Sequence, residues 1–165
     1  MALVLREGDG GIEILFLRRA DDPADPWSVH MAFPGGRSEP GDADLRATAM
    51  RETREEIGLD LGEIADLLGA LDEVRAMARM QPLDLAIAPF VFRLRGPHAE
   101  LTPSAEVTSV HWIRLEDLLG SRFRASMTYS HEGRTIEFPC LQVDDLVIWG
   151  LTYRMFTSFA ERLGR

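Results

Sequence analysis

The sequence predicts an α/β fold, in which helices pack against a β-sheet. Segments with the alternating pattern of strands are interleaved with segments of helical periodicity, and two of the expected helices are long. The 165 residues suit one domain, expected to span 1–165, and the 45% of apolar residues are enough for a sizeable core. No uninterrupted apolar stretch approaches the roughly 20 residues that a membrane-spanning helix requires.

Local signals place the elements along the chain. Strands are expected at 2–6, 12–19, 69–76, 84–95, 107–113, 125–130 and 134–139. Helices are expected at 43–57, 61–68 and 144–163, with one helical turn at 115–119. The first two strands flank Asp9, Gly10 and Gly11, which tolerate the positive φ of a hairpin turn.

The segment before the first long helix carries loop and capping signals. Prolines break regular structure between residues 20 and 31, so we expect a loop there, which contains Trp27. Asp42 or Asp44 can cap the helix, since a short acidic side chain accepts hydrogen bonds from the free N–H groups of the first turn. Gly58 stands where a left-handed residue ends a helix.

Composition and charge narrow the class of partner. The net charge of −9 makes the surface repel nucleic acid and anionic membranes, so neither is an expected partner. A polyanionic small molecule would need a local cation to bind, either a metal ion or a group of arginines. The one cysteine, Cys140, has no partner for an internal disulfide, so we expect a small apolar residue near a strand end in a cytoplasmic protein.

Three carboxylates share one face of the helix expected at 43–57. Glu52, Glu55 and Glu56 stand at i, i+3 and i+4, which places them within an arc of about 100°. The opposite side carries Ala43, Met50, Thr53 and Ile57. Arg51 precedes Glu55 by four residues and can hold that carboxylate in one orientation.

Clustered carboxylates occur in magnesium sites as well as on ordinary surface helices. Like charges at this spacing repel one another by about 0.2–0.5 kcal/mol per pair, and a divalent cation reverses that penalty. Magnesium prefers one or two carboxylates together with water and substrate phosphates. Gly35 and Gly36 precede the helix and give a backbone able to approach a ligand closely and to aim a carbonyl at a metal. The alternative is an amphipathic helix whose charges are only solvated.

The segment at 33–59 resembles the Nudix box, in which one glutamate precedes an Arg-Glu pair and two further glutamates follow. The second half of the box matches Arg51–Leu59 at every fixed position, with Thr53 in place of an aliphatic residue. In the first half, Asp42 follows Gly36 after five residues where the family has glutamate, and eight residues instead of seven lead to the arginine. The resemblance implies an α/β/α sandwich with a mixed β-sheet between helices.

Further features are similar to the coenzyme A pyrophosphatase branch of that family. They are the glycine loop at 33–36 with its longer spacing, the strand at 15–19 that ends in arginine, and the segment at 148–152. Val29 stands where the branch has a glycine, so this sequence departs from the branch at that position.

The resemblance also implies a metal-dependent reaction. The metal would be Mg²⁺, with Mn²⁺ as a substitute, held by Glu52, Glu55, Glu56 and the Gly35 carbonyl. It would bridge the diphosphate, neutralise developing charge and lower the pKa of an attacking water. Glu56 or Glu52 would accept the proton of that water, with Glu106 as a further candidate, and Arg51 would complete the catalytic set.

Three residues are predicted to bind the substrate. Arg19 ends a strand that runs toward the glycine loop and can contact a phosphate, although a surface arginine is the alternative. Gly36 allows the backbone to approach the substrate. Trp27 either stacks on a base or packs the loop.

Three functional hypotheses follow from the sequence. The first is an enzyme that hydrolyses coenzyme A or a related nucleoside diphosphate derivative. The second keeps the chemistry but takes ADP-ribose, a nucleotide sugar, a dinucleoside polyphosphate or a nucleoside triphosphate. The third is a module that senses a nucleotide without cutting it. A homodimer is expected by analogy with the family.

Overall fold

The computed structural model describes residues 1–21, 30–78, 81–96, 100–131 and 133–164. Trp27 lies outside the described residues. Within them, no helix is long and apolar enough to cross a lipid bilayer.

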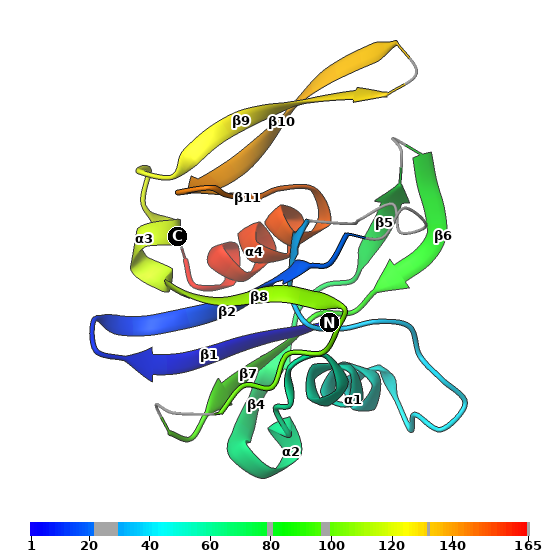
Figure 1. Ribbon diagram of the computed structural model, residues 1–165, viewed down its shortest axis with the longest axis vertical. Helices are drawn as coiled ribbons and strands as arrows, with labels where there is room; N and C mark the ends of the chain where they lie inside the picture. Colours follow the sequence, from blue (N-terminus) through cyan, green and yellow to red (C-terminus); the bar gives the residue numbers. More distant parts are fainter. Residues whose placement is uncertain (22–29, 79–80, 97–99, 132, 165) are drawn as a thin grey trace.

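A six-stranded mixed sheet forms the centre of the protein (Figure 1). The strand order is β3-β2-β1-β7-β4, and β8 pairs with β2. β1 and β7 run parallel, whereas the other paired strands are antiparallel. The strands are β1 (Ala2–Gly8), β2 (Gly11–Arg19), β3 (Met31–Ala32), β4 (Ala65–Ala70), β7 (Phe90–Leu94) and β8 (Val107–Arg114).

Helices cover both faces of this sheet. The helices α1 (Leu45–Ile57) and α2 (Leu61–Ile64) pack on one face, and α3 (Leu115–Leu119) and α4 (Gly150–Arg162) pack on the other. Each face of the sheet packs against its helices in a separate hydrophobic core. The side chains of β1 alternate between these two cores, because successive side chains of a strand point to opposite faces. Ala2 and Val4 pack toward α1, whereas Leu3 and Leu5 pack toward α4. The predicted α/β/α arrangement is thereby confirmed.

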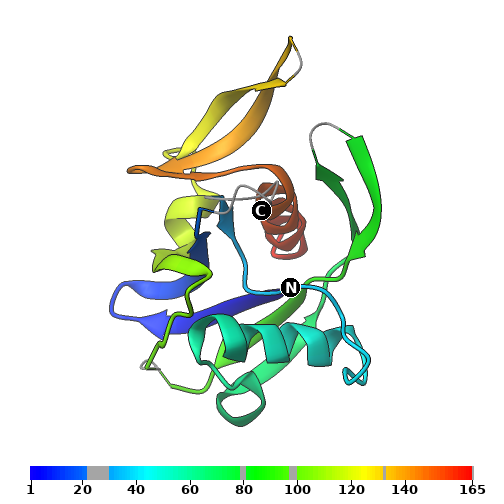
Figure 2. The same cartoon turned by 45° about the vertical axis from the view of Figure 1, so that its right-hand side comes forward.

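Two further hairpins stand on either side of α4 (Figure 2). One is formed by β5 (Val74–Ala78) and β6 (Gln81–Ile87). The other is formed by β9 (Arg124–His131) and β10 (Arg134–Val143), and β11 (Leu146–Ile148) pairs with the far side of β10. Cys140 is buried within β10, in agreement with its predicted apolar role.

Two predictions around residue 70 were wrong. The helix expected at 61–68 ends at Ile64, because the chain continues as β4 and pairs with β7. The strand expected at 69–76 is interrupted at 71–73, so its two parts belong to different sheets. Leu68 is 58% exposed on this edge strand.

Two later predictions need similar correction. The strand expected at 84–95 is two strands, since the chain leaves β6 at Ala88 and Pro89 before it enters the central sheet as β7. Proline lacks the N–H that a continuous ladder needs. The helix expected at 144–163 begins only at Gly150, because residues 144–145 form a turn and β11 follows.

Candidate active site

The helix α1 is fixed at both ends by local contacts. The Asp44 side chain accepts a hydrogen bond from the Ala47 N–H at 2.7 Å, and Gly58 ends the helix in a left-handed conformation with φ of 77°. Asp44 is therefore the capping residue, and Asp42, the other candidate, has a different role. The caps fix the ends of α1, and its buried residues Ala49, Thr53 and Ile57 set its rotation against the sheet and thereby the direction of each glutamate.

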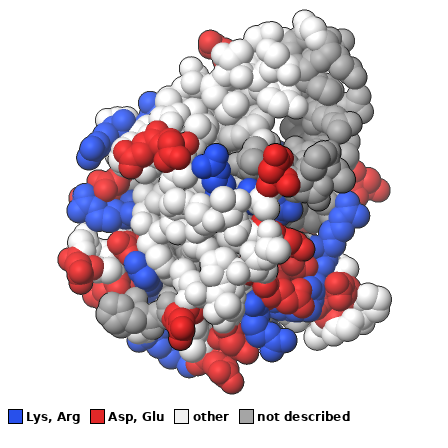
Figure 3. All heavy atoms as spheres, viewed as in Figure 1, with Lys and Arg blue, Asp and Glu red and all other residues white. Residues whose placement is uncertain are grey.

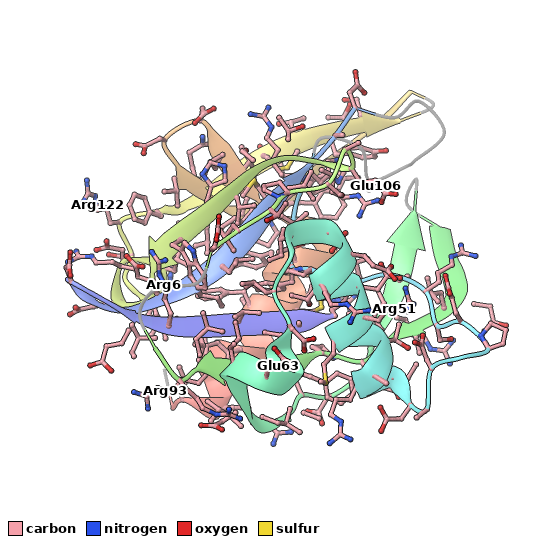
Figure 4. All side chains as sticks on the ribbon, turned by 60° about the horizontal axis from the view of Figure 1, so that its bottom comes forward. Arg6, Arg51, Glu63, Arg93, Glu106 and Arg122 are labelled. Carbon is pink, nitrogen blue, oxygen red and sulfur yellow. The ribbon has the colours of Figure 1, made fainter. Side chains whose placement is uncertain are left out.

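Arg51 is the centre of an ion-pair network on α1. Its guanidinium lies 3.0 Å from one Asp42 carboxylate oxygen and 3.1 Å from the other. The same guanidinium lies 3.1 Å from Glu52 and 2.9 Å from Glu55, and donates to the Arg37 carbonyl at 3.0 Å. Figure 4 shows Arg51 on the side of α1 that faces the preceding loop. Hydrogen bonds from Arg51 hold the pKa of Asp42 well below its usual range.

The network gives the first prediction. Replacement of Arg51 by alanine leaves the Asp42 carboxylate, whose side chain is only 7% exposed, without its cation. We expect the Arg51→Ala variant to melt several degrees below the wild type, measured by circular dichroism at pH 7.

A neighbouring arginine supplies the control for this measurement. Arg54 is 62% exposed and lies 3.8 Å from its acidic neighbour Asp60, so Arg54→Ala should leave the melting temperature nearly unchanged. Equal melting temperatures for Arg51→Ala and Arg54→Ala would contradict the assignment.

Glu56 is buried, although the sequence places it on one helix face with Glu52 and Glu55, opposite the apolar side. Its residue is 5% exposed, and Thr53 and Ile57 beside it are fully buried. One Glu56 carboxylate oxygen accepts the Gly35 N–H at 2.8 Å, and the other lies 3.8 Å from the Arg19 guanidinium. The carboxylate face of α1 is therefore partly buried, because the Glu56 side chain points toward the end of β2.

Burial changes the acidity of two of the carboxylates. Desolvation raises the pKa of Glu56 to about 7, with the Gly35 N–H and Arg19 opposing the shift and the charges of Glu52 and Glu106 adding to it. Desolvation also raises the pKa of Glu52, against the influence of Arg51. A carboxylate with a pKa near 7 can accept a proton efficiently at neutral pH.

The two glycines before α1 allow the close approach that the sequence predicted. Gly35 has φ of 143°, and a Cβ atom there would lie 2.7 Å from the Met1 Cα atom. A Cβ atom on Gly36 would overlap the Glu52 carboxylate. Because these positions have no side chain, the loop lies directly against Glu52 and Glu56.

The chemistry of the donor set fits a hard divalent cation. Glu56 and Glu52 are desolvated carboxylates, and the charge of Glu52 adds to the cost of ionising Glu56, so a cation beside them would relieve that cost. Within the described residues, no three His, Cys, Asp or Glu side chains converge closely enough to hold one ion. Arg51 forms ion pairs with Glu52 and Glu55, so these two side chains would have to turn away from Arg51 to share a cation with Glu56.

A cleft of about 860 Å³ begins at the glycine loop and ends between the two hairpins. Its described lining includes Arg19, Arg37 and Arg154 and contains no aspartate or glutamate. Acidic residues outnumber basic ones by 27 to 18 in the whole chain, so the described lining, with three arginines and no acid, differs from the rest of the protein. Such a lining is suited to an anionic ligand. On the face seen in Figure 3, the described Asp and Glu side chains lie mostly in the middle and lower parts of the molecule, interspersed with Lys and Arg.

Glu106, the further candidate for the proton acceptor, is not among the described residues that line the cleft. Glu106 lies on the exposed loop before β8, and its charge contributes to the raised pKa values of Glu52 and Glu56. The His30 ring packs against Trp149 at 4.8 Å between centroids. The pairing of Asp42 with Arg51 was not predicted from the sequence. The position of Asp42 as the acidic residue of the Nudix box, one residue farther from the arginine, was a signal that could have indicated this pair.

The fold and the site define a class of protein: an α/β/α sandwich in which a glycine loop meets a carboxylate-bearing helix. The chain belongs to the Nudix family, since the model of the NUDIX domain matches residues 1–132. A MutT protein of Methanosarcina mazei superposes with a TM-score of 0.60 at 20% identity, over 99% of this chain and 93% of that one. An Ap4A hydrolase of C. elegans superposes with a TM-score of 0.58 at 23% identity, over 72% and 80%. These two likenesses show the fold.

Curated relatives share parts of the chain. The mitochondrial coenzyme A diphosphatase of Homo sapiens is 32% identical over 81% of this chain and 55% of its own length. The asymmetrical bis(5'-nucleosyl)-tetraphosphatase of Mus musculus is 30% identical over 70% of this chain and 73% of its own length. An uncharacterized protein of Schizosaccharomyces pombe is 40% identical over 64% of this chain. The chain spans about a third of that yeast protein and about half of the human one.

Proposed function

We propose that this protein is a magnesium-dependent pyrophosphohydrolase that cuts a diphosphate linkage in a nucleoside diphosphate derivative. One observation carries the proposal: the buried Glu56 carboxylate, with a pKa near 7, contacts Gly35 and Arg19, and these two residues line a cleft whose described lining has three arginines and no acid. Metal binding by Glu52, Glu55, Glu56 and the Gly35 carbonyl is part of this proposal.

Each residue of the site has a separate task in the proposed reaction. Glu56 accepts the proton of the attacking water, and Glu52 is the alternative acceptor. Arg19, which lines the cleft beside Glu56, binds phosphate oxygens through its planar guanidinium. Arg51 positions Glu52 and Glu55. When bound, the divalent cation supplies neutralisation of the diphosphate charge and a lower pKa for water.

Coenzyme A or a related compound is the proposed substrate. Support comes from the name of the human relative and from the sequence features shared with the coenzyme A pyrophosphatase branch. The mouse relative, whose name refers to a dinucleoside tetraphosphate, supports the second hypothesis, with ADP-ribose, nucleotide sugars and nucleoside triphosphates as further substrates of that class. A cleft of about 860 Å³ has room for ligands of either kind.

A substrate panel tests the proposal. The protein is incubated with Mg²⁺ and coenzyme A, ADP-ribose, a nucleotide sugar, a dinucleoside tetraphosphate or a nucleoside triphosphate, and products are separated by chromatography. Formation of 3′,5′-ADP and phosphopantetheine from coenzyme A is the expected result. Turnover of another compound would support the second hypothesis, and binding without turnover would support the nucleotide-sensing module.

Metal removal gives a further prediction for the same assay. Treatment with EDTA should reduce turnover to the background rate, and excess Mg²⁺ or Mn²⁺ should restore it. Without a cation, the negative charges of the carboxylates and the diphosphate repel one another. Full activity in EDTA would contradict the proposed metal dependence.

Three sequence-based expectations remain part of the proposal. The protein is proposed to be cytoplasmic, to form one domain over 1–165 and to be a homodimer. Sedimentation measures the oligomeric state, a single cooperative unfolding transition tests the one domain, and fractionation of cells that express the natural gene tests the location.

A further inference from the structure

Four aromatic rings gather at the end of the cleft that lies away from α1. The aromatic cluster consists of His30, Tyr129, Phe138 and Trp149, all of which line the cleft. Trp149 is its centre, with ring centroids at 4.8 Å from His30, 5.4 Å from Tyr129 and 5.8 Å from Phe138. All four residues are only half-buried, so part of their ring surface faces the cleft.

One backbone contact connects the aromatic cluster to the glycine-loop end of the cleft. The Arg19 N–H donates to the His30 carbonyl at 3.1 Å, so these two residues are neighbours across β2 and the adjoining segment. Residues paired across strands in this way lie about 5 Å apart. Arg19 turns its guanidinium toward Glu56, whereas His30 packs its ring on Trp149. A ligand of nucleotide size can therefore contact both ends.

The two ends of the cleft offer different chemistry. The glycine-loop end presents the guanidinium groups of Arg19 and Arg37, which suit phosphate oxygens. The far end presents ring faces, which suit a flat aromatic group. A ligand that carries phosphate at one end and an aromatic heterocycle at the other is a nucleotide.

We infer that the aromatic cluster binds the nucleobase of the substrate, with Trp149 as the principal stacking residue. The inference rests on the proposed function, since it uses the same cleft. It assigns base stacking, for which Trp27 was a candidate, to the aromatic cluster. Trp149 stands at the start of α4 with an extended backbone, and its ring packs against Tyr129 and Phe138 of the β9–β10 hairpin.

A pair of ligands isolates the contribution of the base. AMP and ribose 5-phosphate differ by the adenine, and their affinities for the metal-free protein are measured by isothermal titration calorimetry. AMP should bind about tenfold to a hundredfold more tightly than ribose 5-phosphate, because base–aromatic stacking contributes affinity of that order. In Trp149→Ala this difference should fall below about threefold, while the affinity for ribose 5-phosphate stays the same.

Two further variants control for fold and for the loss of any tryptophan. Trp112 lies outside the cleft lining, where the Arg6 guanidinium packs over its ring, so Trp112→Phe should keep the full preference for AMP. Tyr129→Ala removes a half-buried ring of the aromatic cluster from a strand of the hairpin and should reduce the preference even if Trp149→Ala fails to fold.

The results separate this inference from the proposed function. An equal preference for AMP in the wild type, Trp149→Ala and Tyr129→Ala would overturn the inference while diphosphate hydrolysis continued. Conversely, a protein that prefers AMP through Trp149 but hydrolyses no member of the substrate panel would overturn the proposed function and leave the inference standing. A loss of affinity for both ligands alike in a folded variant would also overturn the inference.

Discussion

The Glu56→Gln variant is expected to lose about 100- to 10,000-fold in kcat while its fold stays intact, because it removes the proposed proton acceptor. Glutamine has nearly the same shape as glutamate, and its amide oxygen can still accept the Gly35 N–H that Glu56 accepts at 2.8 Å. The change therefore removes the charge and the basicity of the side chain but keeps its packing. Steady-state kinetics with the best substrate of the panel measure the effect.

Two glutamate variants make this result specific. Glu63→Gln changes an exposed residue of α2, well away from the glycine loop, and should leave kcat unchanged (Figure 4). Glu106→Gln tests a further candidate, since a larger loss of kcat there than in Glu56→Gln would make Glu106 the proton acceptor. A rate for Glu56→Gln equal to that of Glu63→Gln would refute the site assignment as a whole.

The second large effect concerns stability in the absence of metal. The pKa of Glu56 is about 7 in the folded protein against an ordinary value of 4.5, so folding favours the protonated form. The stability that this proton provides is fully present below pH 4.5 and is lost as the pH rises through 7. A pKa difference of this size corresponds to up to roughly 3 kcal/mol in the free energy of unfolding.

The same glutamine variant provides the reference curve for that measurement. In EDTA, the free energy of unfolding from urea titrations should fall between pH 5 and pH 8.5 by more in the wild type than in Glu56→Gln. The variant should thus match the wild type at pH 5 and exceed it at pH 8.5. Added Mg²⁺ should stabilise the wild type at pH 8.5 more than the variant. Parallel pH curves for the two proteins would show that Glu56 carries no raised pKa.

The helix that carries the site was predictable because its signals are local. Asp44, Gly58 and the spacing of Glu52, Glu55 and Glu56 all lie within one short segment, and the structure places α1 where they predict. Asp42 shows the limit of such reasoning. Its distance along the chain left both a capping role and a role in the box open, and only the folded loop brings it to the Arg51 guanidinium.

Elements beyond α1 were less predictable, since their state depends on distant partners. Leu67 and Leu68 belong to a strand because β7 is available to pair with it. The segment at 84–95 divides because one part completes a hairpin and the other enters the central sheet. Neither choice is determined by periodicity in a short apolar run.

The sequence alone determined the family, the layered fold and the residues that form the carboxylate helix, because each of these rests on spacing within a continuous segment. The tertiary structure decided that Glu56 is buried beside Arg19 and Gly35, which raises its pKa, and that rings from three distant segments meet around Trp149 at the other end of the cleft. Both decisions depend on desolvation and on contacts between residues far apart in the chain, which no local pattern of side chains encodes.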